Sequence, residues 1–318
     1  MTNASFRRLS LAALASTLML SAAPVWAAEA ESCSTVRFSD VGWTDITATT
    51  ATASVILKAL GYEPTTTVLS VPVTYSSLKN KDIDVFLGNW MPTMEADIAP
   101  YREEKSVETF GPNLEGAKYT LATNAKGAEL GIKDFADIAK HADALEGKIY
   151  GIEPGNDGNR LIIDMIDGNK FELGSFEVVE SSEQGMLAQV ARAEQDGTPI
   201  VFLGWEPHPM NANFKLTYLS GGDDVFGPDF GGATIYTNTR AGYTTECPNV
   251  GKFVTNLKFS LAMENEIMGK ILNDGEDAEA AATEWLKANP SAVEPWLAGV
   301  TTKDGAEGLA AVKSELGL

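Results

Sequence analysis

The stretch VFLGNWMP at residues 85–92 recurs as VFLGWEP at residues 201–207, which is 116 positions later with one residue deleted. A second pair has the same offset, because FGPNLEGA at 110–117 matches FGPDFGGA at 226–233. Solenoid repeats have periods of roughly 20–50 residues, so this offset does not fit a solenoid. Two matches at one spacing indicate an internal duplication, and the duplication predicts two similar lobes.

Strand-like and helix-like stretches alternate in both halves of the chain. Such alternation predicts an α/β fold in which each lobe has its own parallel sheet covered by helices. The expected strands are 35–41, 67–73, 82–87, 148–152, 176–180 and 199–203. The expected helices between them are 45–60, 158–166 and 183–195, and the tail contributes helices at 278–288 and 305–316.

The first 28 residues have the pattern of a secretory signal peptide. Arg7 and Arg8 precede an apolar run at 9–23, and small residues surround the expected cleavage site. The run is shorter than the ~20 residues that a membrane span needs, which argues against a membrane anchor. We therefore expect export, cleavage near Ala27 or Ala28, and a periplasmic location.

The chain of 318 residues is strongly acidic, with 24 Lys and Arg against 44 Asp and Glu. Its formal net charge is −20, and loss of the two arginines in residues 1–28 changes it to −22. Nucleic-acid affinity comes from Lys and Arg at phosphates, so we expect no nucleic-acid partner. The length predicts about two domains.

The strand-like runs at 119–122 and 233–237 each follow a copy of the FGP repeat, and we interpret them as crossings between the lobes. Lobe one then comprises residues 29–117 and 233–318, and lobe two comprises 118–232. The two cysteines, Cys33 and Cys247, both fall in lobe one. A disulfide between them is the expectation for an exported protein, and two buried free thiols are the alternative.

Three tryptophans follow expected strands: Trp43, Trp90 and Trp205. Ligands of open α/β sheets bind beyond the carboxyl ends of strands. A single tryptophan at such a place is more often part of the packing. Three of them, two related by the duplication, favour a binding site. Indole faces attract cations, and a cage of them is suited to a quaternary ammonium group.

Three further residues extend this candidate site. Tyr119 begins an expected crossing and could form a fourth wall. Asp45 lies beside Trp43, and we expect it to be ionised at pH 7 near a bound cation and to favour a net positive ligand. Asn156 follows the strand at 148–152 and offers both a donor and an acceptor, which suits a hydroxyl group.

The sequence contains no pattern typical of an enzyme. His141 and His208 are its two histidines, and no His/Cys/Asp spacing indicates a metal site. It has neither a G-x-S-x-G elbow nor a Walker A loop. We interpret Glu153 and Asp157 as solvated loop carboxylates. We therefore expect a binding protein without a metal or cofactor.

With these motifs the sequence resembles the periplasmic ligand-binding proteins of ABC importers for choline and glycine betaine. The resemblance covers essentially the whole mature chain, including GWTD at 42–45, both VFLG copies and EPGN at 153–156. It implies a two-lobed periplasmic binding protein fold that closes on its ligand, acts as a monomer and delivers to a membrane permease with the ATPase on another chain. It implies an aromatic box with two polar partners, made of Trp43, Trp90, Tyr119, Trp205, Asp45 and Asn156.

Three ligands remain open, and we rank choline first. Glycine betaine has the same trimethylammonium group but its carboxylate needs donors, for which Arg160 is a candidate. Polyamines come third, with Asp45, Asp157 and Glu206 as candidate partners, because a primary ammonium needs carboxylates more than an aromatic cage.

Overall fold

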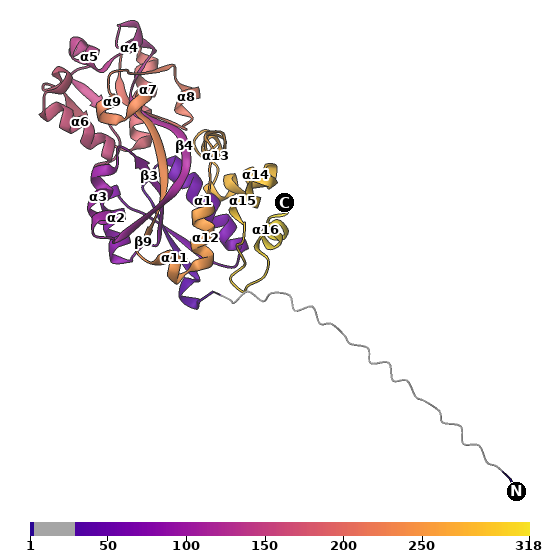
Figure 1. Cartoon of the computed structure of the whole chain (residues 1–318). Helices are drawn as coiled ribbons and strands as arrows, with labels where there is room; N and C mark the ends of the chain where they lie inside the picture. The colour runs from indigo at the N-terminus through magenta and orange to yellow at the C-terminus, as the bar shows by residue number, and fades with distance from the viewer. Residues whose placement is uncertain (3–28) are drawn as a thin grey trace.

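The computed structural model describes residues 1–2 and 29–318, so the predicted signal peptide lies almost entirely outside the described residues. The chain forms two lobes, one containing α1–α3 and α11–α16 and the other α4–α9, joined by the long strands β4 and β9 (Figure 1). This agrees with the predicted two-lobed α/β fold. In the part of the chain described, no helix is long and apolar enough to cross a membrane.

The elements alternate along the chain much as the sequence indicates. Up to the second crossing they are β1 (Thr35–Asp40), α1 (Thr44–Ala59), β2 (Glu63–Val68), α2 (Val71–Asn80), β3 (Val85–Met91), α3 (Glu95–Glu103), β4 (Val107–Asn124), α4 (Ala125–Glu129), α5 (Phe135–Ile138), β5 (Lys148–Tyr150), α6 (Asp157–Asp167), β6 (Glu177–Val179), α7 (Glu183–Asp196), β7 (Val201–Glu206), α8 (Met210–Asn213), β8 (Leu216–Tyr218), α9 (Asp223–Phe226), α10 (Pro228–Gly231) and β9 (Gly232–Arg240). The tail contains α11 (Tyr243–Glu246), α12 (Pro248–Asn256), α13 (Leu261–Asn273), α14 (Ala278–Ala288), α15 (Val293–Trp296) and α16 (Gly308–Leu316).

Each lobe contains three parallel strands, with β1 between β2 and β3 in one and β5 between β6 and β7 in the other. The expectation of a separate sheet in each lobe is wrong. The crossing strands β4 and β9 pair with each other, and β9 also pairs with β3 while β4 pairs with β7. The strand order β2-β1-β3-β9-β4-β7-β5-β6 is therefore continuous through both lobes.

The partner of β4 changes along its length. From Val107 to Lys118 it pairs with β9, and from Lys118 to Thr123 it pairs with β7 of the other lobe. In Figure 1 the two strands run side by side from one lobe to the other. Because β4 changes its pairing partner from β9 to β7 at this position, we propose to keep the lobe boundaries at 29–117 plus 233–318 and 118–232.

The predicted strand at 67–73 is wrong from residue 69 onward. β2 ends at Val68, and α2 begins at Val71. Pro72 explains the difference, because its fixed φ suits the first turn of a helix and it lacks the N–H that a strand interior would use. The β-branched residues of this segment alternate with other residues as they do in a strand, and this pattern led to the strand prediction despite Pro72.

A disulfide joins the two chain segments that form lobe one. Cys33 is bonded to Cys247, with the two Cα atoms 5.6 Å apart and 214 positions between them in the sequence. The predicted disulfide is therefore present. The tail helices α13, α14 and α16 pack against α1, the helix that begins next to Trp43.

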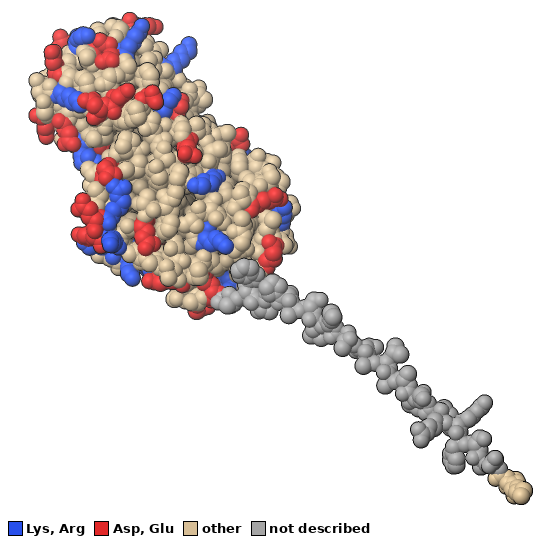
Figure 2. Space-filling view, in the orientation of Figure 1, with Lys and Arg blue, Asp and Glu red and all other residues tan. Residues whose placement is uncertain are grey.

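Charged side chains of both signs are mixed on the face of the molecule that Figure 2 shows. On the face drawn in Figure 2, acidic groups occur on both lobes among basic ones, and the basic groups do not gather into a patch.

Candidate functional site

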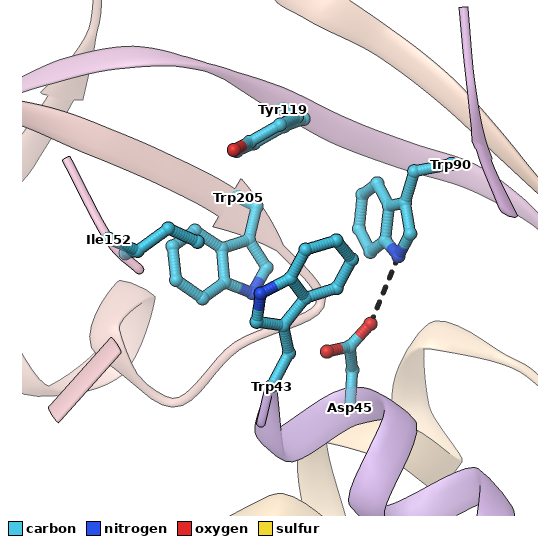
Figure 3. A pocket seen from close by; sticks show the side chains of 6 residues that line it. All are labelled: Trp43, Asp45, Trp90, Tyr119, Ile152 and Trp205. Carbon is cyan, nitrogen blue, oxygen red and sulfur yellow. Dashed lines mark hydrogen bonds between the residues drawn. The ribbon is translucent and has the colours of Figure 1, made fainter. Parts of the chain in front are cut away.

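The three predicted tryptophans and Tyr119 converge on one cavity between the lobes (Figure 3). It is lined by Trp43, Asp45, Trp90, Tyr119, Ile152 and Trp205. Trp43 and Asp45 come from lobe one and Ile152 and Trp205 from lobe two.

The position of each aromatic wall follows from local sequence. Trp90 and Trp205 occupy matching places near the ends of β3 and β7, in the duplicated stretch. A glycine precedes each of them, Gly88 before Trp90 and Gly204 before Trp205. At both glycines a neighbouring side chain packs close to the backbone. A Cβ atom on Gly88 would lie 2.6 Å from Cδ1 of Ile46 on α1, so a larger residue there would force the side chain of Ile46 to move. Glycine thus allows α1 to pack directly behind the site.

The aromatic rings meet edge to face. The centroids of Trp90 and Tyr119 are 5.9 Å apart at 65°, and those of Tyr119 and Trp205 are 6.2 Å apart at 84°. All four aromatic side chains are at most 5% exposed. Cation–π attraction strengthens when water is excluded, so this arrangement is suited to a small desolvated cation. We call these four residues, Trp43, Trp90, Tyr119 and Trp205, the aromatic cage.

Two of the indole N–H groups of the cage are already hydrogen-bonded to carboxyl groups of the protein. Nε1 of Trp43 donates to Oε1 of Glu153 at 2.8 Å, and Nε1 of Trp90 donates to Oδ2 of Asp45 at 3.1 Å. These donors are therefore not free for an acceptor on a ligand. The cage offers aromatic faces and carboxylate oxygen, both of which favour positive charge.

Asp45 is 2% exposed, and its Oδ1 atom has no hydrogen-bond partner among the described residues. Burial, together with the nearby Glu183 and Asp40, raises the pKa of Asp45 from 3.8 to about 8. Without a bound cation most of this side chain is therefore neutral at pH 7. The expected ionisation concerns the protein with a cation bound beside Asp45, and it stays a prediction. A cation beside Oδ1 would favour the charged form and lower the pKa again.

A second buried acid lies behind Asp45. Glu264, on α13, is 2% exposed, and burial, followed by the proximity of Asp45, raises its pKa well above the usual value. The sequence analysis did not identify it, since one glutamate in an amphipathic tail helix has no distinguishing signal. Glu264 does not line the cavity, so Asp45 is the acid that faces it.

Asn156 does not line the cavity. It is the N-cap of α6, where its Oδ1 accepts from the backbone N–H of Asn159 and from the hydroxyl of Tyr119 at 2.8 Å. In this arrangement Asn156 orients the fourth wall of the cage. The predicted contact with a ligand hydroxyl remains a prediction.

The carboxylates interpreted as solvated are placed differently. Asp157 is fully buried, and burial raises its pKa to about 6. Glu153 accepts from Trp43, and burial raises its pKa to about 7. The helix N-terminus and the facing lobe cover both groups, which the loop-like sequence EPGN does not reveal.

Arg160, the candidate donor for a ligand carboxylate, is used elsewhere. It donates to Oδ2 of Asp97 at 2.8 Å and to the carbonyl of Thr93 at 3.2 Å, both in lobe one. Glu206, a candidate for polyamines, lies 3.5 Å from Lys118 and does not line the cavity. Neither residue belongs to the cage.

Besides Glu264, the sequence analysis missed Ile152 and Glu183 as residues that shape the site, and it interpreted Glu153 as solvated. Ile152 ends a predicted strand, so the strand-end rule that identified the tryptophans could have included it. Glu153 and Glu183 act across the gap between the lobes, and no local pattern predicts which carboxyl group faces a closing partner. Among the described residues, no three His, Cys, Asp or Glu side chains form a group that could hold a metal ion.

Comparison with known proteins agrees with this geometry. Residues 34–288 match the model of a family described as the substrate-binding domain of the ABC-type glycine betaine transport system (OpuAC). A solved ABC-transporter choline-binding protein in complex with choline is 80% identical, with a TM-score of 0.90, over 91% of this chain and 100% of the other.

Two further solved structures are similar. An ABC-transporter choline-binding protein in an unliganded semi-closed conformation is 81% identical, with a TM-score of 0.84, over 91% of this chain and 100% of the other. Lactococcal OpuAC, closed on glycine betaine, is 25% identical, with a TM-score of 0.75, over 82% of this chain and 98% of the other.

Proposed function

The chain belongs to the family of substrate-binding domains of ABC-type glycine betaine transport systems, and from that premise we propose that it captures choline and delivers it to the permease of an ABC importer. The observation that carries the proposal is the aromatic cage around a small cavity with one carboxyl group inside. A trimethylammonium group has no N–H to donate, so aromatic faces and a nearby negative charge are what can recognise it.

The site favours choline over glycine betaine, the second candidate. The two ligands share the trimethylammonium group, but betaine adds a carboxylate that needs hydrogen-bond donors. The indole N–H groups of Trp43 and Trp90 are occupied by Glu153 and Asp45, and Arg160 is paired with Asp97. This leaves Nε1 of Trp205 as the one indole donor of the cage with no hydrogen bond to the described residues. Once a trimethylammonium group favours the ionised form of Asp45, a betaine carboxylate would place a second negative charge near it, whereas choline carries a single positive charge and a neutral hydroxyl.

Polyamines fit the site less well. Their primary ammonium ends need several acceptors, and Asp45 is the one carboxyl group among the residues that line the cavity. The other walls are four aromatic rings and Ile152. An ammonium group with three N–H donors would be incompletely hydrogen-bonded there, which is costly in a buried site.

A substrate-binding protein of an ABC importer works outside the cytoplasm. We propose the periplasm as the compartment, with residues 1–28 as the signal peptide and cleavage near Ala27 or Ala28. The disulfide agrees with an oxidising compartment. The proposed partners are a permease in the membrane and an ATPase on a separate chain, and the mature protein acts as a monomer.

Calorimetric titration of the purified mature protein with choline, glycine betaine and putrescine tests the proposal. We expect the tightest binding for choline, weaker binding for betaine and the weakest for putrescine. A reversed order of choline and betaine would contradict the assignment of the ligand while keeping the family. Release of a product from a choline ester or phosphocholine would contradict a role in binding alone.

A further inference from the structure

The first turn of α1, residues Trp43–Asp45, carries two of the cavity-lining side chains but has no cap of its own. Its N-cap residue is Trp43, whose side chain makes no capping hydrogen bond. Thr44 is 3% exposed, so water does not satisfy its backbone N–H. A buried helix terminus requires some other acceptor.

Glu183 of lobe two is that acceptor. Its Oε2 accepts from the backbone N–H of Thr44 at 2.9 Å, and its Oε1 accepts from the hydroxyl of Thr44 at 2.5 Å. Glu183 begins α7 and is 1% exposed, although the residue that it contacts lies in lobe one, 139 positions earlier. The cap of α1 therefore comes from the opposite lobe.

His208 connects Glu183 to the other side of the cage. The backbone N–H of Met210 donates to Nδ1 of His208 at 2.9 Å, so the neutral ring carries its proton on Nε2. That N–H faces Oε1 of Glu183 at 3.2 Å. The ring of His208 also packs edge to face on Trp205, with centroids 4.8 Å apart. Glu183 thus links the turn that holds Trp43 and Asp45 to the tryptophan of lobe two.

We propose that Glu183 is a positioning residue that makes completion of the aromatic cage depend on closure of the two lobes. The inference rests on the proposed function, since it concerns the same cavity. When the lobes separate, Thr44 loses its acceptors, and the turn that presents Trp43 and Asp45 loses its cap. The hydrogen bond between Trp43 and Glu153 also joins the two lobes, so it too forms only when the lobes close.

Glu183→Gln tests this with almost no change in shape. Each orientation of the amide loses a bond: an NH₂ group in place of Oε2 meets the N–H of Thr44, and one in place of Oε1 meets the N–H of His208. Hydrogen bonds to charged groups are worth a factor of about 10–100 in an equilibrium constant. We expect the dissociation constant for choline to rise by about that factor, mainly through faster dissociation.

The matched control is Glu194→Gln, the same change at an exposed position of the same helix. It should leave choline binding unchanged. Circular dichroism and thermal unfolding without ligand show whether each variant folds. A lower melting temperature of unliganded Glu183→Gln with an unchanged dissociation constant would mean that Glu183 serves only the fold of lobe two, and would overturn the inference.

Changes on the other lobe keep the test decisive even if Glu183→Gln fails to fold. Thr44→Val removes the hydroxyl at nearly constant volume and should weaken choline binding, whereas Thr44→Ser retains it and should bind as the wild type does. Equal binding by these two variants would overturn the inference. Where Glu183→Gln folds, its effect and that of Thr44→Val should combine to less than their product.

The proposed function and this inference fail in different ways. Wild-type protein that does not bind choline would contradict the proposed function itself. Wild-type protein that binds choline, with Glu183→Gln and Thr44→Val binding equally well, would contradict only the role of Glu183. Small-angle scattering at saturating choline adds a direct readout, because the wild type should become more compact than Glu183→Gln.

Discussion

Replacement of Asp45 by asparagine should weaken choline binding by an amount that grows with pH. The change keeps the size of the side chain and an acceptor for Trp90, but it removes the negative charge from the cavity. In the wild type, Oδ1 of Asp45 is buried without a partner, so a cation beside it is the natural counter-charge. The variant therefore isolates the electrostatic part of recognition.

The magnitude follows from two opposing effects. At an effective dielectric constant of about 20, unit charges ~4 Å apart attract by about 4 kcal/mol. With the pKa of Asp45 at about 8, ionising it at pH 7 costs about 1.4 kcal/mol. The net effect is roughly 2–3 kcal/mol at pH 7, or a factor of about 30–150 in the dissociation constant. At pH 6 it falls to a factor of about 10, and at pH 9 it approaches several hundred.

Calorimetry in two buffers of different ionisation enthalpy measures both the affinity and the protons released. Because the pKa of the unliganded site is about 8, binding of choline at pH 7 should release close to one proton from the wild type and fewer from Asp45→Asn. Glu153 and Glu264 remain in both proteins, so the difference belongs to Asp45. Asp164→Asn, at an exposed position of α6, is the matched control and should behave as the wild type does.

Parallel pH profiles for the wild type and Asp45→Asn would refute this reasoning. So would wild-type affinity of the variant at pH 8. The ratio of the betaine and choline dissociation constants adds a second criterion, since the lost charge attracts one ligand and repels the carboxylate of the other. That ratio should fall in the variant, and a constant ratio would mean that Asp45 has only a structural role.

Other predictions concern the cage, the stability and the disulfide. Alanine at each cage tryptophan should weaken choline binding by more than ~1 kcal/mol, because both the ring face and the seal against water are lost. Trp285 lies on α14, does not line the cavity and donates to Glu266, so Trp285→Ala should bind normally in the same titration. Burial raises the pKa of Asp45 from 3.8 to about 8, so stability is lost as pH rises through that interval; Asp45→Asn should raise the melting temperature of the unliganded protein more at pH 8.5 than at pH 4, and equal shifts would count against the burial argument. Joint replacement of Cys33 and Cys247 by alanine should lower the unfolding free energy by ~2–5 kcal/mol in denaturant titrations, because a loop of 214 positions is released, while choline affinity should stay the same.

The sequence predicted the parts of the fold that repeat or alternate. The duplicated VFLG stretch identified the matching strands that hold Trp90 and Trp205, and the FGP repeats identified the neighbourhood of the crossings. It did not predict that one sheet continues through both lobes, because the pairing of β4 and β9 with strands far away in the sequence produces no periodic pattern of residues. It also failed at 67–73, where a proline in the first turn of a helix outweighs β-branched residues.

The aromatic cage was predictable because its members stand at strand ends. Their supporting groups were not. Glu153 and Glu183 reach the cage only when two lobes meet, and Asn156 serves a helix terminus and Tyr119 instead of lining the cavity. The protonation of Asp45 depends on burial and on the neighbouring acids, which the linear sequence does not place together.

The most direct test of the central claim is a crystal structure of the protein with choline bound. The account predicts that the trimethylammonium nitrogen lies between the lobes, within ~6 Å of the ring centroids of Trp43, Trp90, Tyr119 and Trp205, with Oδ1 of Asp45 as the nearest carboxyl oxygen. A trimethylammonium group bound outside this cavity, or turned away from the rings with the hydroxyl in their place, would contradict it.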